Sequence, residues 1–256
     1  MINKMSRSCK RIESLKLFAT ILLAAVVFCF PSCKKESIDP TYSKAKFTIQ
    51  MYSADTKIVW DNVGYSNAAG NTFGVSNANF YISGIVMKSA TKTYTSKKAF
   101  YIDPKIAAKS YFLLDSIPPA DYTEITMYIG LDKNTNKSNS LIATTDNVNM
   151  AWPDMMGGGY HFLKLEGSYL DSLNVTKGYA IHLGKNENLI TVKLTKLMHQ
   201  KYWNHTYTLN FNVNEVFANP YKYDLDLEAN YTMSDSLAML RIKNNMTDVF
   251  TLNQDN

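Results

Sequence analysis

Cysteine is scarce in this chain. Its 256 residues include three, Cys9, Cys29 and Cys33, all near the beginning of the sequence. From Lys34 onward there is no thiol, so this part of the chain forms no internal disulfide and offers no thiolate to a metal. Zinc-finger, iron–sulfur and thiol-nucleophile chemistry are excluded there. A metal bound by this part must use histidine, methionine, carboxylate or carbonyl ligands.

Catalytic motifs and a strong charge of one sign are also lacking. The sequence has no Gly-x-Ser-x-Gly elbow, no His-Glu-x-x-His motif and no phosphate-binding glycine loop, so we do not expect an enzyme. The first 32 residues hold five of the 27 basic residues and one of the 22 acidic residues. The remainder is nearly neutral, with 22 basic and 21 acidic residues, and nucleic acid is therefore not an expected partner.

The first 32 residues have the pattern of a bacterial signal peptide. A basic segment precedes an apolar stretch from Leu17 to Phe30, which is shorter than the ~20 residues of a membrane-spanning helix. The stretch ends at Pro31-Ser32-Cys33, where a small residue precedes a cysteine, although Phe30 takes the place usually held by an aliphatic residue. We predict a lipid on Cys33. The alternative is ordinary cleavage that leaves Cys33 free.

This interpretation divides the chain into three parts. They are a signal peptide over 1–32, a polar lipidated tether over 33–43 and a single domain over 44–256, since no linker-like segment interrupts the last part. The expected partner is a membrane, reached through the lipid. Because Lys34 and Lys35 follow the cysteine without an acidic retention signal, we expect an exported protein in the cell envelope, at the outer membrane.

Alternation of apolar and polar residues predicts antiparallel strands with one solvated face. Asn-rich segments supply the turns between them. Two packed sheets are the natural way to bury such strands, so the predicted fold is all-β, an antiparallel β-sandwich. The alternating sets are Phe47, Ile49 and Met51; Ile125, Met127 and Ile129; Ile190, Val192 and Leu194; and Tyr207, Leu209, Phe211 and Val213.

One segment near the end of the chain does not follow the two-residue alternation of a strand. Ser234 is a suitable N-cap residue, and the apolar residues after it recur at helical spacing. We therefore predict one short C-terminal amphipathic helix that closes the domain. Its apolar residues are Met239, Ile242, Met246, Val249 and Phe250.

The most unusual segment runs from Met150 to His161. Three consecutive glycines lie inside it, close to a tryptophan and three methionines. Glycine allows a positive φ or a close approach of the backbone. About twenty residues later, His182 lies near the centre of a second short strand.

In order and spacing, these elements resemble the MbnP-like family of bacterial copper-binding proteins, over roughly Lys46 to Phe250. The resemblance implies an exported β-rich protein in which histidines bind copper together with a tryptophan oxidised to kynurenine. Residue by residue, it points to His161, His182 and Trp152. The matching elements are Met-x-Trp, Gly-Tyr, Lys-Leu-Glu-Gly and His-Leu-Gly between Met150 and Gly184, together with Tyr81–Ile85, Gly130–Asp132, Glu215–Pro220 and Asn244–Phe250.

The residue types are compatible with copper. Imidazole binds copper in either oxidation state and thioether binds the cuprous ion, so Met155 and Met156 could complete a two-histidine site. Equally, methionine and a strand histidine are common core residues. Strand alternation places His161 on the face of Leu163, whereas His182 points away from its apolar neighbours. Exposed imidazoles close enough to share one ion would favour a metal site, and burial against leucines would favour packing.

A second histidine pair, His199 and His205, accompanies Trp203. Its setting is polar and lies outside the strongest family elements. We interpret it as a solvated turn.

Asp132, Asn134, Asn136 and Asn139 make an oxygen-rich loop. The glycine and distal glutamate of a calcium-binding EF-hand are missing. We expect a solvated turn and no calcium.

Two functional interpretations follow. The first is an envelope lipoprotein that captures, stores or hands over copper through the residues named above. The second is a non-metal binding or structural β-sandwich, whose 17 tyrosines contact a glycan or an envelope protein partner.

Overall fold

The computed structural model describes residues 42–255. The chain separates into Met1–Asp39 and Pro40–Asn256, and the described residues belong to the second unit. The predicted signal peptide, Cys33 and all but the end of the predicted tether lie outside the described residues. The first strand begins at Ser43, one residue before the predicted start of the domain. Over residues 42–255, no helix has both the length and the apolar character to cross a membrane.

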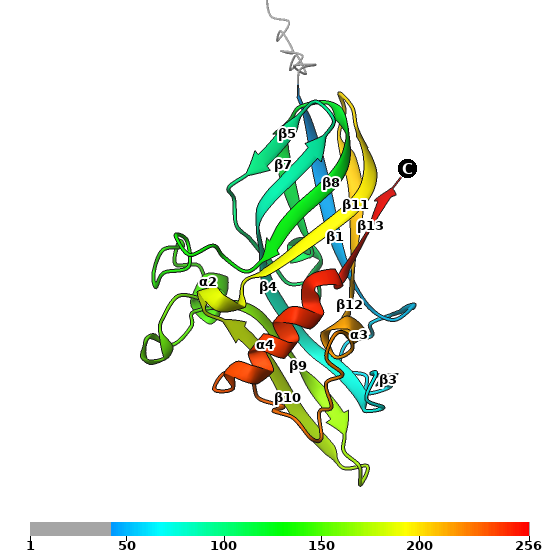
Figure 1. The fold of residues 1–256 in the computed structure, drawn as a ribbon, viewed down its shortest axis with the longest axis vertical. Coiled ribbons are helices and arrows are strands. Elements are labelled where there is room, and N and C mark those ends of the chain that lie inside the picture. Colours follow the sequence, from blue (N-terminus) through cyan, green and yellow to red (C-terminus); the bar gives the residue numbers. More distant parts are fainter. Residues whose placement is uncertain (1–41, 256) are drawn as a thin grey trace, which may run out of the picture. The chain divides into compact units, whose positions relative to one another are not determined.

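Two sheets form the domain, which confirms the predicted all-β sandwich (Figure 1). In the first sheet the order is β13-β12-β1-β2, and β7 also pairs with β1. Its strands are β1 (Ser43–Ser53), β2 (Thr56–Lys57), β7 (Tyr111–Ile117), β12 (His205–Asn212) and β13 (Phe250–Asp255).

The second sheet has the order β10-β9-β4-β8-β11, and three short strands pair with β4. Its strands are β3 (Tyr65–Ser66), β4 (Thr72–Ser89), β5 (Thr93–Ser96), β6 (Phe100–Ile102), β8 (Ala120–Ile129), β9 (His161–Leu170), β10 (Thr176–Gly184) and β11 (Ile190–Gln200).

The core lies between the sheets and is rich in aromatic rings. β1 shows the predicted alternation, with every second residue buried. Phe47 of β1 stacks on Phe112 and Tyr207 at centroid distances of 5.0 and 4.9 Å. Phe80 of β4 reaches across to Phe211 of β12, 5.6 Å away, and so joins the two sheets. Offset and tilted pairs of this kind stabilise a core beyond the area that they bury.

One strand pair departs from the antiparallel prediction. β1 and β12 are parallel, with Phe47 opposite Tyr207. Parallel neighbours require a long connection between them. Most of the domain separates these two strands in sequence, so no hairpin imposes the antiparallel direction.

The C-terminal helix exists but is shorter than predicted. α4 spans Ser236–Asn245, and its N-cap is Asp235, whose side chain accepts a hydrogen bond from the Ala238 N–H, rather than Ser234. A 3₁₀ turn over Met246–Asp248 follows, and Phe250 starts β13. The helix therefore does not close the domain, because the chain returns to pair with β12.

The remaining helical segments are short. Val213, predicted to end a strand, instead begins α3. The other segments are α2 (Thr145–Asn149), α3 (Val213–Val216), and the 3₁₀ turns Ala107–Lys109, Asp154–Met156 and Asn186–Asn188.

Candidate metal centre

The glycine-rich segment folds as an irregular hairpin. The Trp152 N–H donates to the Gly159 carbonyl at 2.9 Å, and the His161 N–H donates to the Met150 carbonyl at 2.7 Å. The three glycines between have φ of 110°, 68° and 86°, in the left-handed region that favours glycine. This run of positive φ turns the chain back and brings Trp152 beside His161.

Asn136 supports this hairpin. Its side-chain oxygen accepts from the Tyr160 N–H at 2.9 Å, and its amide donates to Asn186. A Cβ on Gly159 would lie 2.4 Å from that oxygen. Asn136 is buried, so the prediction of a wholly solvated turn is wrong at this residue.

A β-bulge sets the direction of His161. Between β9 and β10, His182 pairs with Lys164 and Leu183 with Leu163, but Gly184 then pairs with His161 and leaves an extra residue on β9. An extra residue reverses the alternation of faces beyond it. The prediction that His161 shares the face of Leu163 is therefore wrong, and His161 lies next to His182.

The two imidazoles are in contact. Their ring centroids are 5.1 Å apart and their planes are nearly perpendicular, at 89°. The Trp152 indole packs against the His161 imidazole, with 4.7 Å between their ring centroids. We call His161 and His182 the inner histidine pair.

Each of the two rings uses one nitrogen for a hydrogen bond. His161 Nδ1 lies 3.2 Å from the Met150 carbonyl, and His182 Nε2 lies 2.7 Å from Glu166 Oε1. Carbonyl and carboxylate oxygens accept, so these two nitrogens carry protons. In the neutral rings the lone pairs are then on His161 Nε2 and His182 Nδ1.

These two lone-pair nitrogens are buried and unpaired. Among residues 42–255, no hydrogen-bond partner reaches His161 Nε2 or His182 Nδ1. Leaving a buried polar atom without a partner costs roughly 1–3 kcal/mol. On each ring the other nitrogen bonds to a carbonyl or a carboxylate, which is the arrangement typical of a histidine metal ligand.

Burial and proximity also perturb the ionisation of this group. Burial, reinforced by the neighbouring His182, lowers the pKa of His161 to about 4. The hydrogen bond from His182 lowers the pKa of Glu166 to about 2, and a second bond from Asn77 assists. At neutral pH, His161 is therefore uncharged and Glu166 is ionised, as a metal ligand and its carboxylate partner require.

Trp152 is held in a fitted slot. Its indole is buried, with 2% of the residue exposed, and its Nε1–H donates to the Met156 carbonyl at 3.3 Å. A Cβ on Gly184 would lie 2.3 Å from the indole. Glycine at position 184 is thus needed for the indole to lie against the strand. A pocket of about 300 Å³ opens beside Trp152, lined in part by Tyr160 and Val148.

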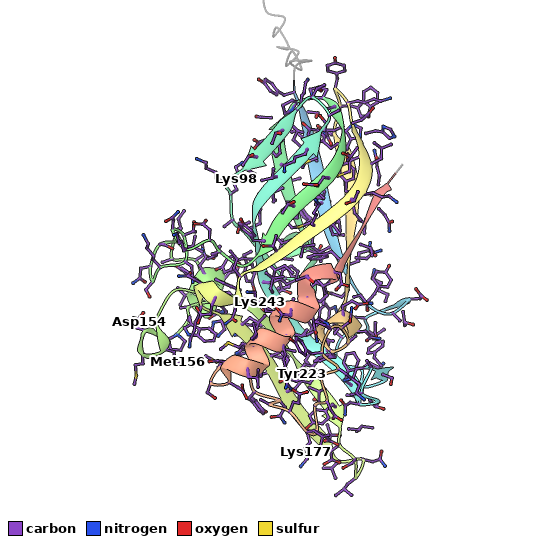
Figure 2. The ribbon with its side chains drawn as sticks, in the orientation of Figure 1. Lys98, Asp154, Met156, Lys177, Tyr223 and Lys243 are labelled. Carbon is purple, nitrogen blue, oxygen red and sulfur yellow. The ribbon has the colours of Figure 1, made fainter. Side chains whose placement is uncertain are left out.

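Met155 and Met156 lie in the 3₁₀ turn that precedes the three glycines. Met155 is fully exposed, whereas Met156 is partly buried and packs against the core. Figure 2 shows Asp154 and Met156 on the loop outside the sheets. Within residues 42–255, no three His, Cys, Asp or Glu side chains are grouped to hold a metal.

The outer histidine pair, His199 and His205, is arranged differently. His199 Nδ1 bonds to Asp121 at 2.7 Å, and His205 Nε2 accepts from the Lys201 N–H at 2.9 Å. The Trp203 ring is 5.9 Å from that of His205, and Trp203 is 60% exposed. The segment between β11 and β12 is the exposed turn that its sequence indicated.

Sequence reasoning missed Glu166 and Met150. Glu166 is the acid of the Lys-Leu-Glu-Gly element, and pairing β9 with β10 as a hairpin would have placed it diagonally opposite His182. Met150 acts through its backbone carbonyl, which the residue type does not reveal.

Together, these features define a β-sandwich protein with a tryptophan and two touching histidines at the open end of the β9–β10 hairpin. The profile of the MbnP family matches residues 42–237, and the chain belongs to this family. Its fold is similar to the solved structure of MbnP from Methylosinus trichosporium, with a TM-score of 0.57 and 11% sequence identity, over 84% of this chain and 99% of the other. No curated protein sequence matches the chain.

Proposed function

We propose that this protein is a cell-envelope lipoprotein, anchored at Cys33, that binds copper through His161 and His182. The observation that carries the copper site is the pair of buried, unpaired nitrogens on adjacent imidazoles. Family membership adds support, because the family resemblance implies copper and points to these histidines and Trp152.

The donor set favours the cuprous ion. His161 is neutral at pH 7 because burial lowers its pKa, so its imidazole is free to act as a ligand. A soft ion of low coordination number suits two imidazoles with a thioether or indole-derived neighbour. Copper bound there would supply a reservoir for capture, storage or handover. The role of this chain is to hold both imidazoles in the binding tautomer and to exclude water around them.

The alternative is a site without metal. His161 is 5% exposed, more buried than a freely accessible ligand, and this would also suit a packing role. The exposure expected of a metal ligand is therefore not met at His161, although the rings of Trp152 and His182 lie against it. If copper does not bind, the exposed tyrosines and the pocket beside Trp152 support a module for a glycan or an envelope protein.

A copper titration distinguishes these functions. We expect the wild-type chain to bind one Cu(I) ion tightly under reducing conditions and the double variant His161→Ala, His182→Ala to lose that binding. The matched control is His199→Ala, His205→Ala, which removes the same residue types from the outer pair and should bind as the wild type does. Equal binding by all three proteins would refute the copper site.

The state of Trp152 needs a separate measurement. Intact mass and peptide mapping of the protein purified from its natural host would show whether the indole is oxidised. Comparing Trp152→Phe with wild type in the same titration would show whether Trp152 contributes to binding.

A further inference from the structure

The beginning of β1 shares one end of the sandwich with two strand turns. Ser43 pairs with Ile117 at the end of β7, and Ala45 pairs with His205 at the start of β12. Gln200 at the end of β11 pairs with Ala120 at the start of β8. The entry of the chain, the β7–β8 turn and the β11–β12 turn therefore lie together (Figure 1). We call this the entry end.

Large apolar side chains are exposed at the entry end. Trp203 and Tyr202 in the β11–β12 turn are 60% and 57% exposed, and Tyr42 at the start of the described chain is 48% exposed. Tryptophan and tyrosine each combine an apolar ring with a polar group, and both are enriched at the headgroup level of membranes. Tyr231 and Tyr221, away from this end, are also exposed, at 61% and 41%, so the exposed rings mark the entry end only together with its lysines and its closeness to the anchor.

Positive charge accompanies these rings. Lys201 Nζ lies 5.9 Å from the Trp203 ring centroid, and Lys44 is exposed in the first residues of β1. Lys92 reaches the β7–β8 turn, where it donates to the Pro119 carbonyl at 3.0 Å. Two acids flank that turn, and both have partners: Asp121 bonds to His199 and Asp115 pairs with Lys98. Exposed lysines beside aromatic rings complement anionic lipid headgroups.

A hollow of about 620 Å³ opens between these side chains, with Lys201, Trp203 and Gln254 among the residues that line it. It offers a lysine and imidazole nitrogens to a polar group and an indole edge to an acyl chain. This is the composition expected of a lipid headgroup position.

The length of the preceding chain brings this end close to the anchor. Tyr42 follows Cys33 by nine residues. Even a fully extended segment of that length reaches only roughly 30 Å. A lipid on Cys33 would therefore hold the entry end at or near the bilayer.

We propose that the entry end docks on the lipid bilayer surface, with Tyr42, Tyr202 and Trp203 at headgroup level and Lys44 and Lys201 on anionic headgroups. The docking proposal rests on the lipid at Cys33, which is part of the proposed function, but it does not rest on copper. Docking in this orientation would hold the inner histidine pair away from the membrane. β11 runs from the entry end to Ile190, a rise of roughly 30 Å. Beyond its far end, Asn188 bonds to Gly184 beside the site.

Tryptophan fluorescence tests this orientation. The full chain, lipidated in its host and checked by intact mass, is reconstituted in vesicles of phosphatidylethanolamine and phosphatidylglycerol with brominated acyl chains. We expect quenching and a blue shift of Trp203 emission. Trp203→Phe should lose most of the quenching, because Trp152 is buried and Trp60 follows the opposite end of β1. Trp60→Phe, the matched control, should keep it.

Quenching that is equal in Trp203→Phe and wild type, or absent from the verified lipidated protein, would overturn the docking. A second variant, Tyr202→Ser with Trp203→Ser, should weaken flotation of the unlipidated Cys33→Ser chain with the same vesicles several-fold. Flotation unaffected by that variant would also count against the proposal. Copper titration of the same samples reports separately on the inner pair, so failure of one proposal is distinguishable from failure of the other.

Discussion

The inner and outer histidine pairs use the same residue types in two environments. Each pair has a tryptophan beside one imidazole, at 4.7 Å for Trp152 and His161 and at 5.9 Å for Trp203 and His205. The inner rings touch, are mostly buried and keep one unpaired nitrogen each. In the outer pair, each ring has a hydrogen-bond partner at an exposed turn.

The difference shows that composition alone does not identify a metal site. At the outer turn, water satisfies any nitrogen left free, so the arrangement carries little energetic cost. At the inner pair water is excluded, and an unpaired nitrogen destabilises the fold until something binds it. A buried unpaired nitrogen with a fixed tautomer is therefore the more specific indication of a ligand.

The largest expected contrast is in pH dependence without metal. His161 has its pKa lowered from 6.5 to about 4, so the folded protein resists protonation there. The stability from neutral His161 is present above about pH 6.5 and is lost as the pH falls towards 4, by up to roughly 3 kcal/mol. Urea unfolding at a series of pH values with a chelator should show this loss in wild type. His161→Leu should flatten it, and His199→Leu should not; equal slopes in both variants would contradict the assignment.

The next contrast concerns Glu166, which orients His182. Glu166→Ala removes the acceptor that fixes the His182 tautomer, so we expect Cu(I) affinity to fall by roughly 10–100-fold. Glu166→Gln keeps an oxygen acceptor and should recover part of the loss. Glu124→Ala, which removes a partly exposed partner of Lys193, is the control. A loss of affinity in Glu124→Ala as large as in Glu166→Ala would point to general electrostatics instead.

Gly184 tests the packing of the inner tryptophan. A Cβ there would lie 2.3 Å from the indole, so Gly184→Ala should displace Trp152 and lower the free energy of unfolding by about 1–3 kcal/mol. Gly178→Ala, whose Cβ would meet the movable Tyr231 hydroxyl at 3.0 Å, should cost less. Chemical denaturation measures both, and an unchanged Gly184→Ala protein would show that the slot is looser than described.

The smallest effect is expected at the outer pair. His199→Ala and His205→Ala each remove an exposed, solvated contact, so the free energy of unfolding should change by no more than about 0.5 kcal/mol. A larger loss in thermal or urea unfolding would mean that the turn stabilises the sandwich and would weaken the contrast between the pairs.

Much of the fold could be predicted from the sequence. Alternation in β1, β8, β11 and β12 identified the strands and the sandwich, because period two is a local property of a half-buried strand. The C-terminal helix was predicted with the wrong cap and the wrong end. The apolar spacing of the residues near Phe250 is compatible with a helix or a strand. Their pairing with β12 makes them a strand.

The candidate site was predicted less completely. His161, His182 and Trp152 were found through the family resemblance, and the structure brings them together. Met155 was included on its chemistry, but the loop leaves it in solvent. Glu166 was missed, because its role depends on the strand that lies beside it.

The sequence by itself determined that the domain has two half-buried sheets and that, beyond Cys33, any metal must be held without thiolates. Only the tertiary structure decided which histidines meet. Strand alternation assigns His161 to the core face, and one bulged residue between β9 and β10 moves it to the face of His182. A pattern read along the chain assumes regular pairing, whereas the register between two strands is fixed by packing across the whole sheet.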